Sequence, residues 1–285
     1  MTSVMDWALP PELSAAVETM DGLFAGAAPL GVAFSGGVDS SVLLALAVRA
    51  LGAEQVVAIL AVSPSLAQDD RRGAHEVAAY IGARLVELRT REGDRQAYRA
   101  NGPDRCFQCK DELFTRISDE VVQKYGLAAV AYGENADDAK RPDRPGSRAA
   151  TNHKVLRPLA DAGLDKAAVR TIARTLRLPS AEKPAAPCLA SRIPHFQEVT
   201  EAKLAQIETA EKALRTLGFV QSRVRHHGDV ARIELATEDL ERALSPGTRT
   251  HLHAAVAAAG FRFVTVDVLG IQSGAFTLSV LSSER

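Results

Sequence analysis

Between about residues 30 and 135, short apolar runs alternate with longer stretches in which apolar residues recur at helical spacing. The apolar runs, which predict strands, are LGVAF, QVVAILAV, RLVELR and AAVAY. The intervening stretches, which predict helices, include residues 40–51 and 68–82. Strands that alternate with helices are typical of a parallel sheet covered by helices, so we predict an α/β, Rossmann-like domain with its sites at the carboxyl ends of the strands.

The pattern becomes irregular further along the chain. Residues 139–154 and 179–198 are rich in proline and polar residues and have no period, so they predict exposed loops on either side of a helix at 164–178. Thr200 predicts the N-cap of a helix that ends before Gly218. A hairpin turning at Gly228 and Asp229, a helical stretch, a strand at 261–268 and a last strand near 276–281 follow. We therefore predict a main domain over 1–198 and a smaller α+β domain over 199–285, for substrate binding or oligomerisation.

Composition narrows the function classes. The 285 residues are 46% hydrophobic and 24% charged, which is ordinary for a soluble globular protein. The net charge of -1 provides no global field for a polyanion, so we expect no nucleic-acid partner and only local nucleotide binding. No apolar run approaches the roughly 20 residues of a membrane helix, and the N-terminus lacks a secretory signal. We expect no membrane association and a cytoplasmic location, which suits an odd number of cysteines, three.

A glycine- and serine-rich turn follows the first predicted strand. It has the sequence SGGVDSS and comprises Ser35, Gly36, Gly37, Val38, Asp39, Ser40 and Ser41. The glycines allow a tight backbone whose N–H groups converge on an anion at a helix N-terminus, and the serines can donate hydroxyl hydrogen bonds. The turn contains no lysine, which distinguishes it from the GxxxxGK[ST] loop. We predict a phosphate site, with Asp39 orienting the loop or binding Mg²⁺.

Acidic residues follow the fourth predicted strand, at the same sheet edge. The segment GENADD contains Gly133, which we place at the nucleotide, and side chains that could bind Mg²⁺ through oxygen: Glu134, Asn135, Asp137 and Asp138. A solvated turn is the alternative. We take Asp39 and Asp137 as the magnesium ligands.

The three cysteines occupy two separate segments. Cys106 and Cys109 form a CxxC at a predicted helix start, which suits buried thiols, a redox dithiol or half of a metal site. Cys188 lies in the proline-rich segment KPAAPCLASRIP. A zinc ion would need a fourth ligand, for which His153 and His195 are candidates.

A strand near residues 222–227 carries Arg223, Arg225 and His227 on one face, because side chains alternate along a strand. Two adjacent guanidinium groups suit a phosphate or a pair of carboxylates, whereas the alternative is the exposed polar face of a hairpin. Arg192 and Glu211 are further substrate-binding candidates, although their spacing favours solvated surface charges.

Five segments together resemble the LarE-type sulfur transferases of the PP-loop ATP pyrophosphatase superfamily. They are SGGVDSS, RCFQCK, GENADD, KPAAPCLASRIP and RVRHHGDVARIE, and they span nearly the whole chain. The resemblance implies a HUP-type fold and an enzyme that cleaves ATP between its α and β phosphates and adenylylates its substrate. It also places Ala61 and Ser63, at the end of the second strand, at the adenine.

The resemblance further implies a pyridinium dicarboxylate mononucleotide as substrate, held by Arg223 and Arg225 and converted to a thiocarboxylate. Cys188 would be either the sulfur source, activated by cations such as Arg192 or Lys183, or one of three ligands, with Cys106 and Cys109, of a [4Fe–4S] cluster. A homo-oligomer that hands its product to other cofactor-biosynthesis proteins is also implied. The alternatives are a tRNA thiolase, an amide-forming ligase of the NAD or GMP synthetase type, and a non-enzymatic nucleotide or redox sensor.

Overall fold

The computed structural model describes residues 10–141, 145–184 and 187–272, and the chain divides into two compact units. The first unit comprises Met1–Glu92 and Cys106–Ala186, and the second comprises Gly93–Arg105 and Pro187–Arg285. The second unit thus begins before the expected boundary at residue 198 and includes a distant segment. Backbone hydrogen bonds explain this difference, since Phe196 N donates to Asn101 O (3.1 Å) and Val199 N donates to Arg99 O (2.9 Å).

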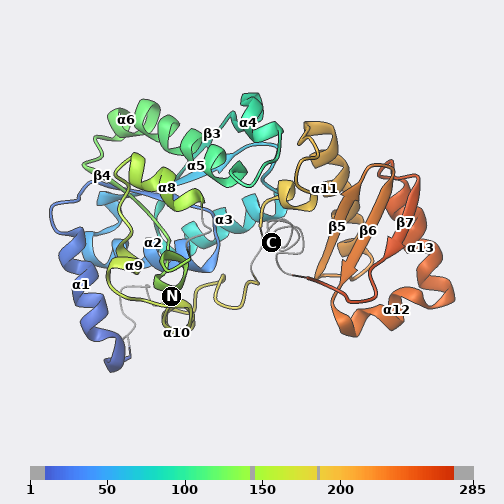
Figure 1. Cartoon of the computed structure of the whole chain (residues 1–285). Helices are drawn as coiled ribbons and strands as arrows, with labels where there is room; N and C mark the ends of the chain where they lie inside the picture. The colour runs from blue at the N-terminus through green and yellow to red at the C-terminus, as the bar shows by residue number, and fades with distance from the viewer. Residues whose placement is uncertain (1–9, 142–144, 185–186, 273–285) are drawn as a thin grey trace. The chain divides into compact units, whose positions relative to one another are not determined.

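A parallel sheet of four strands forms the centre of the first unit, in the order β3-β2-β1-β4 (Figure 1). The strands are β1 (Leu30–Phe34), β2 (Val56–Val62), β3 (Arg84–Arg89) and β4 (Ala129–Tyr132). The sequence of β2, VVAILAV, is a continuous apolar run because a strand covered on both faces has no solvent side. These strands confirm the predicted α/β class.

Helices cover both faces of this sheet. Those of the first unit are α1 (Ser14–Phe24), α2 (Val38–Leu51), α3 (Gln68–Ile81), α5 (Arg105–Arg116), α6 (Gln123–Tyr125), α7 (Ala136–Ala139), α8 (Pro145–Asn152), α9 (Pro158–Asp161) and α10 (Lys166–Thr175). The short 3-10 turns η2 (Pro11–Leu13) and η3 (Ala53–Gln55) and the π-helical turn η5 (Ile117–Val122) complete the set. One apolar core contains residues of α1, α2, α3 and α10, and a second contains residues of α5, η5 and α8. The sheet therefore separates two cores and exposes mainly its strand ends.

Helix α8 corrects one prediction, because part of the expected exposed loop at 139–154 is helical. Pro145 stands at its first position, where a proline costs no hydrogen bond, and Ala149 and Ala150 are fully buried. These two small residues pack into the core beside α5. Two adjacent alanines between arginines and prolines do not produce a recognisable helical period, which explains the error.

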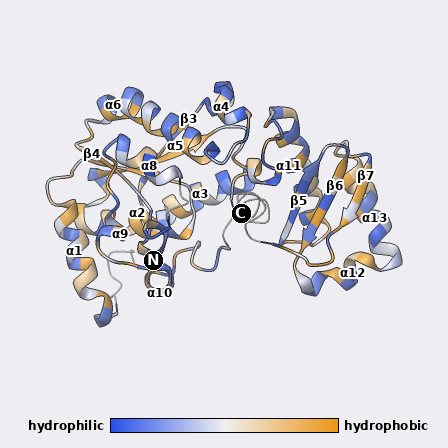
Figure 2. Cartoon of the chain, in the orientation of Figure 1, coloured by the Kyte–Doolittle hydropathy of each residue, from blue (hydrophilic) through white to orange (hydrophobic). Residues whose placement is uncertain are grey.

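The second unit contains a three-stranded sheet in the order β5-β6-β7. Strands β5 (Ser222–His227) and β6 (Val230–Leu235) form the predicted antiparallel hairpin, and β7 (Phe263–Val266) is parallel to β6. The predicted last strand near 276–281 lies outside the described residues. In Figure 2, β5 is mainly hydrophilic and β6 mainly hydrophobic. Strand β5 is at the edge of this sheet, where polar side chains are common.

The helices of the second unit are α4 (Gln96–Arg99), α11 (Glu201–Thr216), α12 (Leu240–Leu244) and α13 (Pro246–Ala257). Its 3-10 turns are η6 (Leu189–Arg192) and η7 (Thr237–Asp239), and η4 (Glu92–Asp94) lies at the junction of the two units. Thr200 caps α11 as predicted, accepting a hydrogen bond from Lys203 N (3.3 Å). An apolar core of residues from α11, α12, α13 and all three strands confirms the smaller α+β fold.

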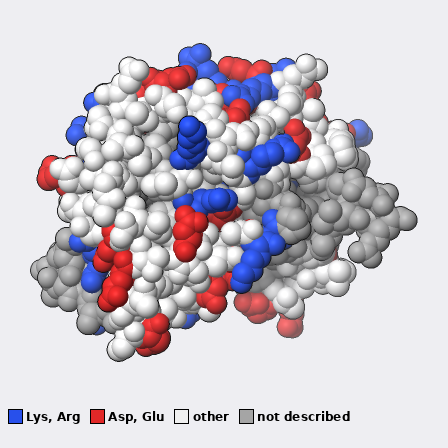
Figure 3. Space-filling model, turned by 60° about the vertical axis from the view of Figure 1, so that its left-hand side comes forward, with Lys and Arg blue, Asp and Glu red and all other residues white. Residues whose placement is uncertain are grey.

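Charges on the surface are mixed. On the face that Figure 3 shows, basic and acidic side chains of the described residues are interspersed. Over the described ranges, no helix has both the length and the apolar character to cross a bilayer.

Candidate active site

The turn SGGVDSS connects β1 to α2 and requires glycine at position 36. Gly36 has a φ of +69°, and a Cβ there would lie 2.8 Å from the Cα of Ala74 in α3. Gly37 precedes α2 as its N-cap, with extended backbone angles. The first N–H groups of α2 have no carbonyl partner within the helix, so together with the helix dipole they favour an anion at this turn.

The serine hydroxyls of this turn hold its shape. Ser40 Oγ and Ser41 Oγ both donate to Gly37 O, at 3.0 and 2.8 Å. Ser35 Oγ lies 3.2 Å from Ser40 Oγ, and Ser35 N donates to Ser40 Oγ (3.3 Å). A preorganised turn can receive phosphate without first ordering its backbone.

Asp39 is connected to the segment after β4. Asn135 Nδ2 donates to Asp39 Oδ1 (3.0 Å) and to Asp138 Oδ2 (3.0 Å), and Asn135 also caps α7. Lys166 Nζ pairs with Asp39 Oδ2 at 2.5 Å, and Lys166 N donates to Asp137 Oδ2 at 3.0 Å. Asp39 thus pairs with the ammonium group of Lys166, whereas Asp137 accepts from the main-chain nitrogen of that residue. Lys166 lies in the predicted helix at 164–178, but no motif of the sequence marked it as part of the site.

Glu134 is buried, which excludes one of the two alternatives for its segment, the solvated turn. Ser147 donates to its Oε1, and Arg157 Nη1 lies 3.7 Å from its Oε2. Its exposed fraction of 2% excludes a solvated turn. Glu134 fastens α8 and the segment before α9 to the end of β4.

Ala61 and Ser63 lie at the carboxyl end of β2, as expected from the sequence. Ser63 Oγ donates to Glu92 Oε1 (2.5 Å), which also accepts from Ser65 Oγ (2.9 Å). Glu92 and Ser65 are buried. Glu92 stands in no motif of the sequence, yet its carboxylate connects the ends of β2 and β3 beside the expected adenine site.

The cysteines are divided between the units. Cys106 and Cys109 lie in the first turn of α5 and Cys188 lies immediately before η6, with Cys106 and Cys188 exposed and Cys109 half-buried. Neither unit gathers three or more His, Cys, Asp or Glu side chains in a metal-binding arrangement among its described residues. His153 Nε2 lies 2.9 Å from Asp111 Oδ1, and His195 Nδ1 lies 3.1 Å from Asn101 O.

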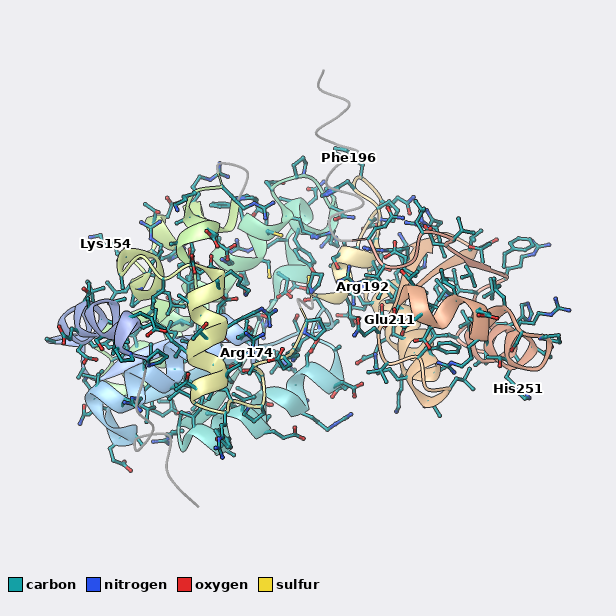
Figure 4. The ribbon with its side chains drawn as sticks, turned by 90° about the horizontal axis from the view of Figure 1, so that it is seen from below. Lys154, Arg174, Arg192, Phe196, Glu211 and His251 are labelled. Carbon is teal, nitrogen blue, oxygen red and sulfur yellow. The ribbon has the colours of Figure 1, made fainter. Side chains whose placement is uncertain are left out.

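Arg192 and Glu211 are not solvated surface charges, contrary to the spacing-based expectation. They form a buried ion pair with two contacts, Arg192 Nε to Glu211 Oε1 (2.9 Å) and Nη2 to Oε2 (3.3 Å). Their side chains are only 8% and 5% exposed. Figure 4 labels both residues, which lie side by side. Lys183, the other cation expected near Cys188, pairs with Asp70 (2.9 Å) in the first unit.

Arg223 and Arg225 share one side of β5, as the alternation predicts. Arg223 Nη1 and Arg225 Nη2 both donate to Gln272 O, at 3.3 and 3.0 Å. Arg225 is buried and pairs with Glu234 (2.8 Å), a partner on β6 that the sequence analysis missed. His227 extends this side, with its Nε2 accepting from Arg232 Nε at 3.3 Å.

The charge around Arg223 favours an anion. Burial lowers the pKa of Arg223, and the positive charges of Arg192 and Arg225 lower it further. A phosphate or carboxylate beside these side chains would offset the repulsion. The hydrogen bond from Arg225 Nη1 to Ser191 O (3.0 Å) fastens the Cys188 segment to the same strand.

Comparisons with known proteins show the family of the chain. A family model described as asparagine synthase matches residues 14–131. An uncharacterized protein of Synechocystis sp. is 39% identical over 243 residues, which cover 85% of this chain and 90% of that protein. The pyridinium-3,5-bisthiocarboxylic acid mononucleotide synthase of Lactiplantibacillus plantarum is 33% identical over 243 residues, covering 85% and 87%. Because one-third of the residues match this synthase over most of both lengths, the chain belongs to the LarE-type ATP-dependent sulfur transferases of the PP-loop superfamily.

Proposed function

We propose that the chain activates a carboxylate of a pyridinium dicarboxylate mononucleotide with ATP and converts it to a thiocarboxylate. The hydrogen bond from Arg225 Nη1 to Ser191 O carries this proposal, because it joins the segment of Cys188 to the strand of Arg223 within one unit. The sulfur of Cys188 and the arginine-bearing side of β5 therefore belong to the same unit. The name of the Lactiplantibacillus plantarum relative provides the substrate class.

In the first step, the turn at residues 35–41 would hold the β and γ phosphates of ATP at the N-terminus of α2. A carboxylate oxygen of the substrate attacks the α-phosphorus. The bond from that phosphorus to the bridging oxygen breaks, and pyrophosphate leaves. Lys166 adds positive charge where pyrophosphate forms, and the resulting acyl-adenylate has AMP as its leaving group.

Magnesium fits the donor set at this turn. Asp39 accepts from the side chain of Lys166 and Asp137 from its main-chain nitrogen, so the two carboxylates are neighbours, and carboxylates together with phosphate oxygens are a common ligand set for Mg²⁺. We assign these two residues to the metal. When bound, Mg²⁺ would offset the charge of the departing pyrophosphate.

The substrate's own phosphate would bind at β5. Burial and then the positive charges of Arg192 and Arg225 lower the pKa of Arg223, whereas Glu234 and Glu211 oppose this effect. Because each of these two carboxylates pairs with one of the neighbouring arginines, an anion would gain mainly from the guanidinium of Arg223. Arg225 pairs with Glu234 and donates hydrogen bonds to main-chain carbonyls. We therefore give it a structural role on this side of the strand. Arg223 is therefore the main phosphate contact.

In the second step, sulfur reaches the activated carbonyl at Cys188. The Cys188 thiolate attacks the carbonyl carbon, AMP leaves, and a thioester forms. Removal of the Cα proton of Cys188 then breaks its Cβ–Sγ bond, which yields the thiocarboxylate and leaves dehydroalanine in the chain. The exposed side chain of Cys188 allows this attack.

A cluster held by three cysteines is the other route to the same product. Cys106 and Cys109 suit it, because residues three apart in a helix lie on one side. The third ligand would be Cys188, which belongs to the other unit. A [4Fe–4S] cluster with three protein ligands would provide an iron that can carry sulfide.

The test combines anaerobic purification, iron and sulfide analysis, and turnover with ATP and the dicarboxylate mononucleotide. We expect pyrophosphate release that depends on the carboxylate substrate, and a product in which sulfur replaces oxygen. Cys188→Ser should retain pyrophosphate release and lose thiolation. A protein mass loss equal to hydrogen sulfide at Cys188 identifies the sacrificial route, whereas unchanged mass over several turnovers identifies the cluster.

The same assay separates the rival functions. An amide-forming ligase would produce a carboxamide when ammonia or glutamine is supplied, and a tRNA thiolase would release pyrophosphate only with tRNA. A sensor would show no pyrophosphate release that depends on the carboxylate. Any of these three results, or thiolation by Cys188→Ser, would refute the proposed function.

A further inference from the structure

We propose that Arg192 is a positioning residue, which fixes the backbone of Cys188 relative to the arginine strand β5. The inference rests on the proposed function, in which Cys188 delivers sulfur to a substrate held at that strand. Arg192 does not contact the substrate in this scheme. Its partners are the segment that carries the Cys188 thiol and the carboxylate of Glu211, which is bonded to β5.

One nitrogen of Arg192 binds the cysteine segment. Its Nη1 donates to Pro187 O (2.7 Å), to Ser191 Oγ (2.9 Å) and to Cys188 O (3.4 Å). A backbone bond from Ser191 N to Cys188 O (2.9 Å) closes the turn between them. The main chain at Cys188 is therefore held on both sides, while the side chain remains exposed.

The remaining guanidinium nitrogens bind Glu211, and Glu211 binds the strand. Glu211 Oε1, which accepts from Arg192 Nε, also accepts from Val224 N (3.0 Å). Val224 stands between Arg223 and Arg225 along β5. A continuous set of hydrogen bonds thus runs from the carbonyl of Cys188 through Arg192 and Glu211 to the strand, parallel to the direct bond from Arg225 to Ser191 O.

The chemistry of the pair supports a geometric role. The adjacent Glu211 carboxylate balances the charge of Arg192, so the local field at the thiol owes little to this guanidinium. The planar guanidinium group of arginine has donors in fixed directions, so it can bind a carboxylate and three oxygen atoms of a turn at the same time. A lysine side chain has only one nitrogen for these contacts. Displacing a reacting group by about 1 Å can reduce the rate about 10²-fold.

The test compares Arg192→Lys and Glu211→Gln with Arg174→Lys in the full-length protein. Arg174 forms a similar two-contact pair with Glu182 (2.7 and 3.4 Å), but on the exposed surface of the first unit. Hydrogen–deuterium exchange of peptides covering residues 187–196 reports the order of the segment without any substrate. The pH profile of Cys188 alkylation by iodoacetamide, mapped by mass, reports the thiol.

We expect faster exchange confined to residues 187–196 and a fall in thiolation kcat of about 10²-fold with an unchanged KM for ATP, for both test variants. The alkylation pH midpoint should stay within experimental error for Arg192→Lys, because lysine keeps the pair with Glu211 neutral overall, whereas Glu211→Gln leaves the charge of Arg192 unbalanced and should lower the midpoint. Arg174→Lys should match the wild type. Exchange that is unchanged, or that rises equally throughout the second unit, would overturn the positioning role.

Failure of the proposed function is distinguishable from failure of this inference. If no variant or wild-type protein thiolates the substrate but exchange at 187–196 still rises, the positioning of Cys188 stands and the proposed reaction falls. If Arg192→Lys does not fold, Ser191→Ala removes one Arg192 contact and should increase exchange in the same peptides. Unchanged exchange in that variant and in Glu211→Gln would contradict the proposal.

Discussion

Gly133 lies so close to Ser40 that a Cβ added to Gly133 would be 2.7 Å from Ser40 N and 2.9 Å from the carbonyl carbon of Asp39. These contacts are with backbone atoms, which cannot rotate away as a side chain can. The end of β4 therefore sets the position of the first turn of α2. In the proposed function that turn holds the phosphates of ATP, so we expect Gly133 to affect ATP binding through the positions of Ser40 and Asp39.

Gly133→Ala should weaken ATP binding. Relief of the clash must move the N-terminus of α2, and overpacking of this kind costs about 1–3 kcal/mol. We expect the KM for ATP to rise roughly tenfold. Gly22→Ala is the matched control, since a Cβ at Gly22 meets nothing within 4 Å and the residue lies inside α1. Equal KM values for the two variants would refute the role of Gly133.

Lys166→Met should raise the KM for ATP with little change in stability. The Lys166 side chain is 39% exposed, so its pair with Asp39 contributes at most about 1 kcal/mol to folding. Its charge lies beside the phosphate turn, where we expect roughly a tenfold effect on KM. Lys212→Met, an exposed site on α11, serves as the control. Pyrophosphate release against ATP concentration measures both, and an unchanged KM for Lys166→Met would contradict the assignment.

Glu234→Gln should destabilise the second unit strongly. Arg225 and Glu234 have side chains that are 4% and 0% exposed, so the variant leaves a buried guanidinium without its balancing charge. We expect the free energy of unfolding to fall by roughly 3 kcal/mol. Asp239→Asn disrupts the exposed pair with Arg242 and should cost less than about 1 kcal/mol. Urea denaturation measures both changes, and similar values would show that burial of Arg225 does not matter.

The acid stability of the first unit should depend on Glu87. Hydrogen bonds from Arg71 and then His75 lower its pKa to about 2 from 4.5. A depressed pKa means that the ionised carboxylate stabilises the fold fully above about pH 4.5, and that this contribution is lost as the pH falls toward 2. Unfolding midpoints of Glu87→Gln and wild type should differ above about pH 5 and converge near pH 2. Arg71→Met should show the same pH dependence as Glu87→Gln. A difference in unfolding midpoint from the wild type that persists near pH 2 would show that ionisation of Glu87 is not the cause.

Local pattern was sufficient for most strands and longer helices of both units. The strand LGVAF and the helix capped by Thr200 follow from burial and capping, which act on neighbouring residues. Helix α8 was missed because its buried alanines lie among prolines and arginines that carry no period. The segment from Gly93 to Arg105 was predicted to belong to the main domain. Its hydrogen-bond partners lie more than 80 residues further along the chain, as for Asn101 and His195, which are 94 residues apart, so no local pattern connects them.

The sequence by itself determined the α/β fold and the glycine-rich turn, because apolar periodicity and glycine spacing act over a few residues, and it indicated the family through the resemblance of five segments. Tertiary structure alone decided that Lys166 pairs with Asp39, 127 residues away, and that Arg192 and Glu211, which looked like surface charges, form a buried pair. The type of a charged residue does not reveal whether it lies on the surface or in a core. Its burial depends on which distant segments pack around it, and no local pattern contains that information.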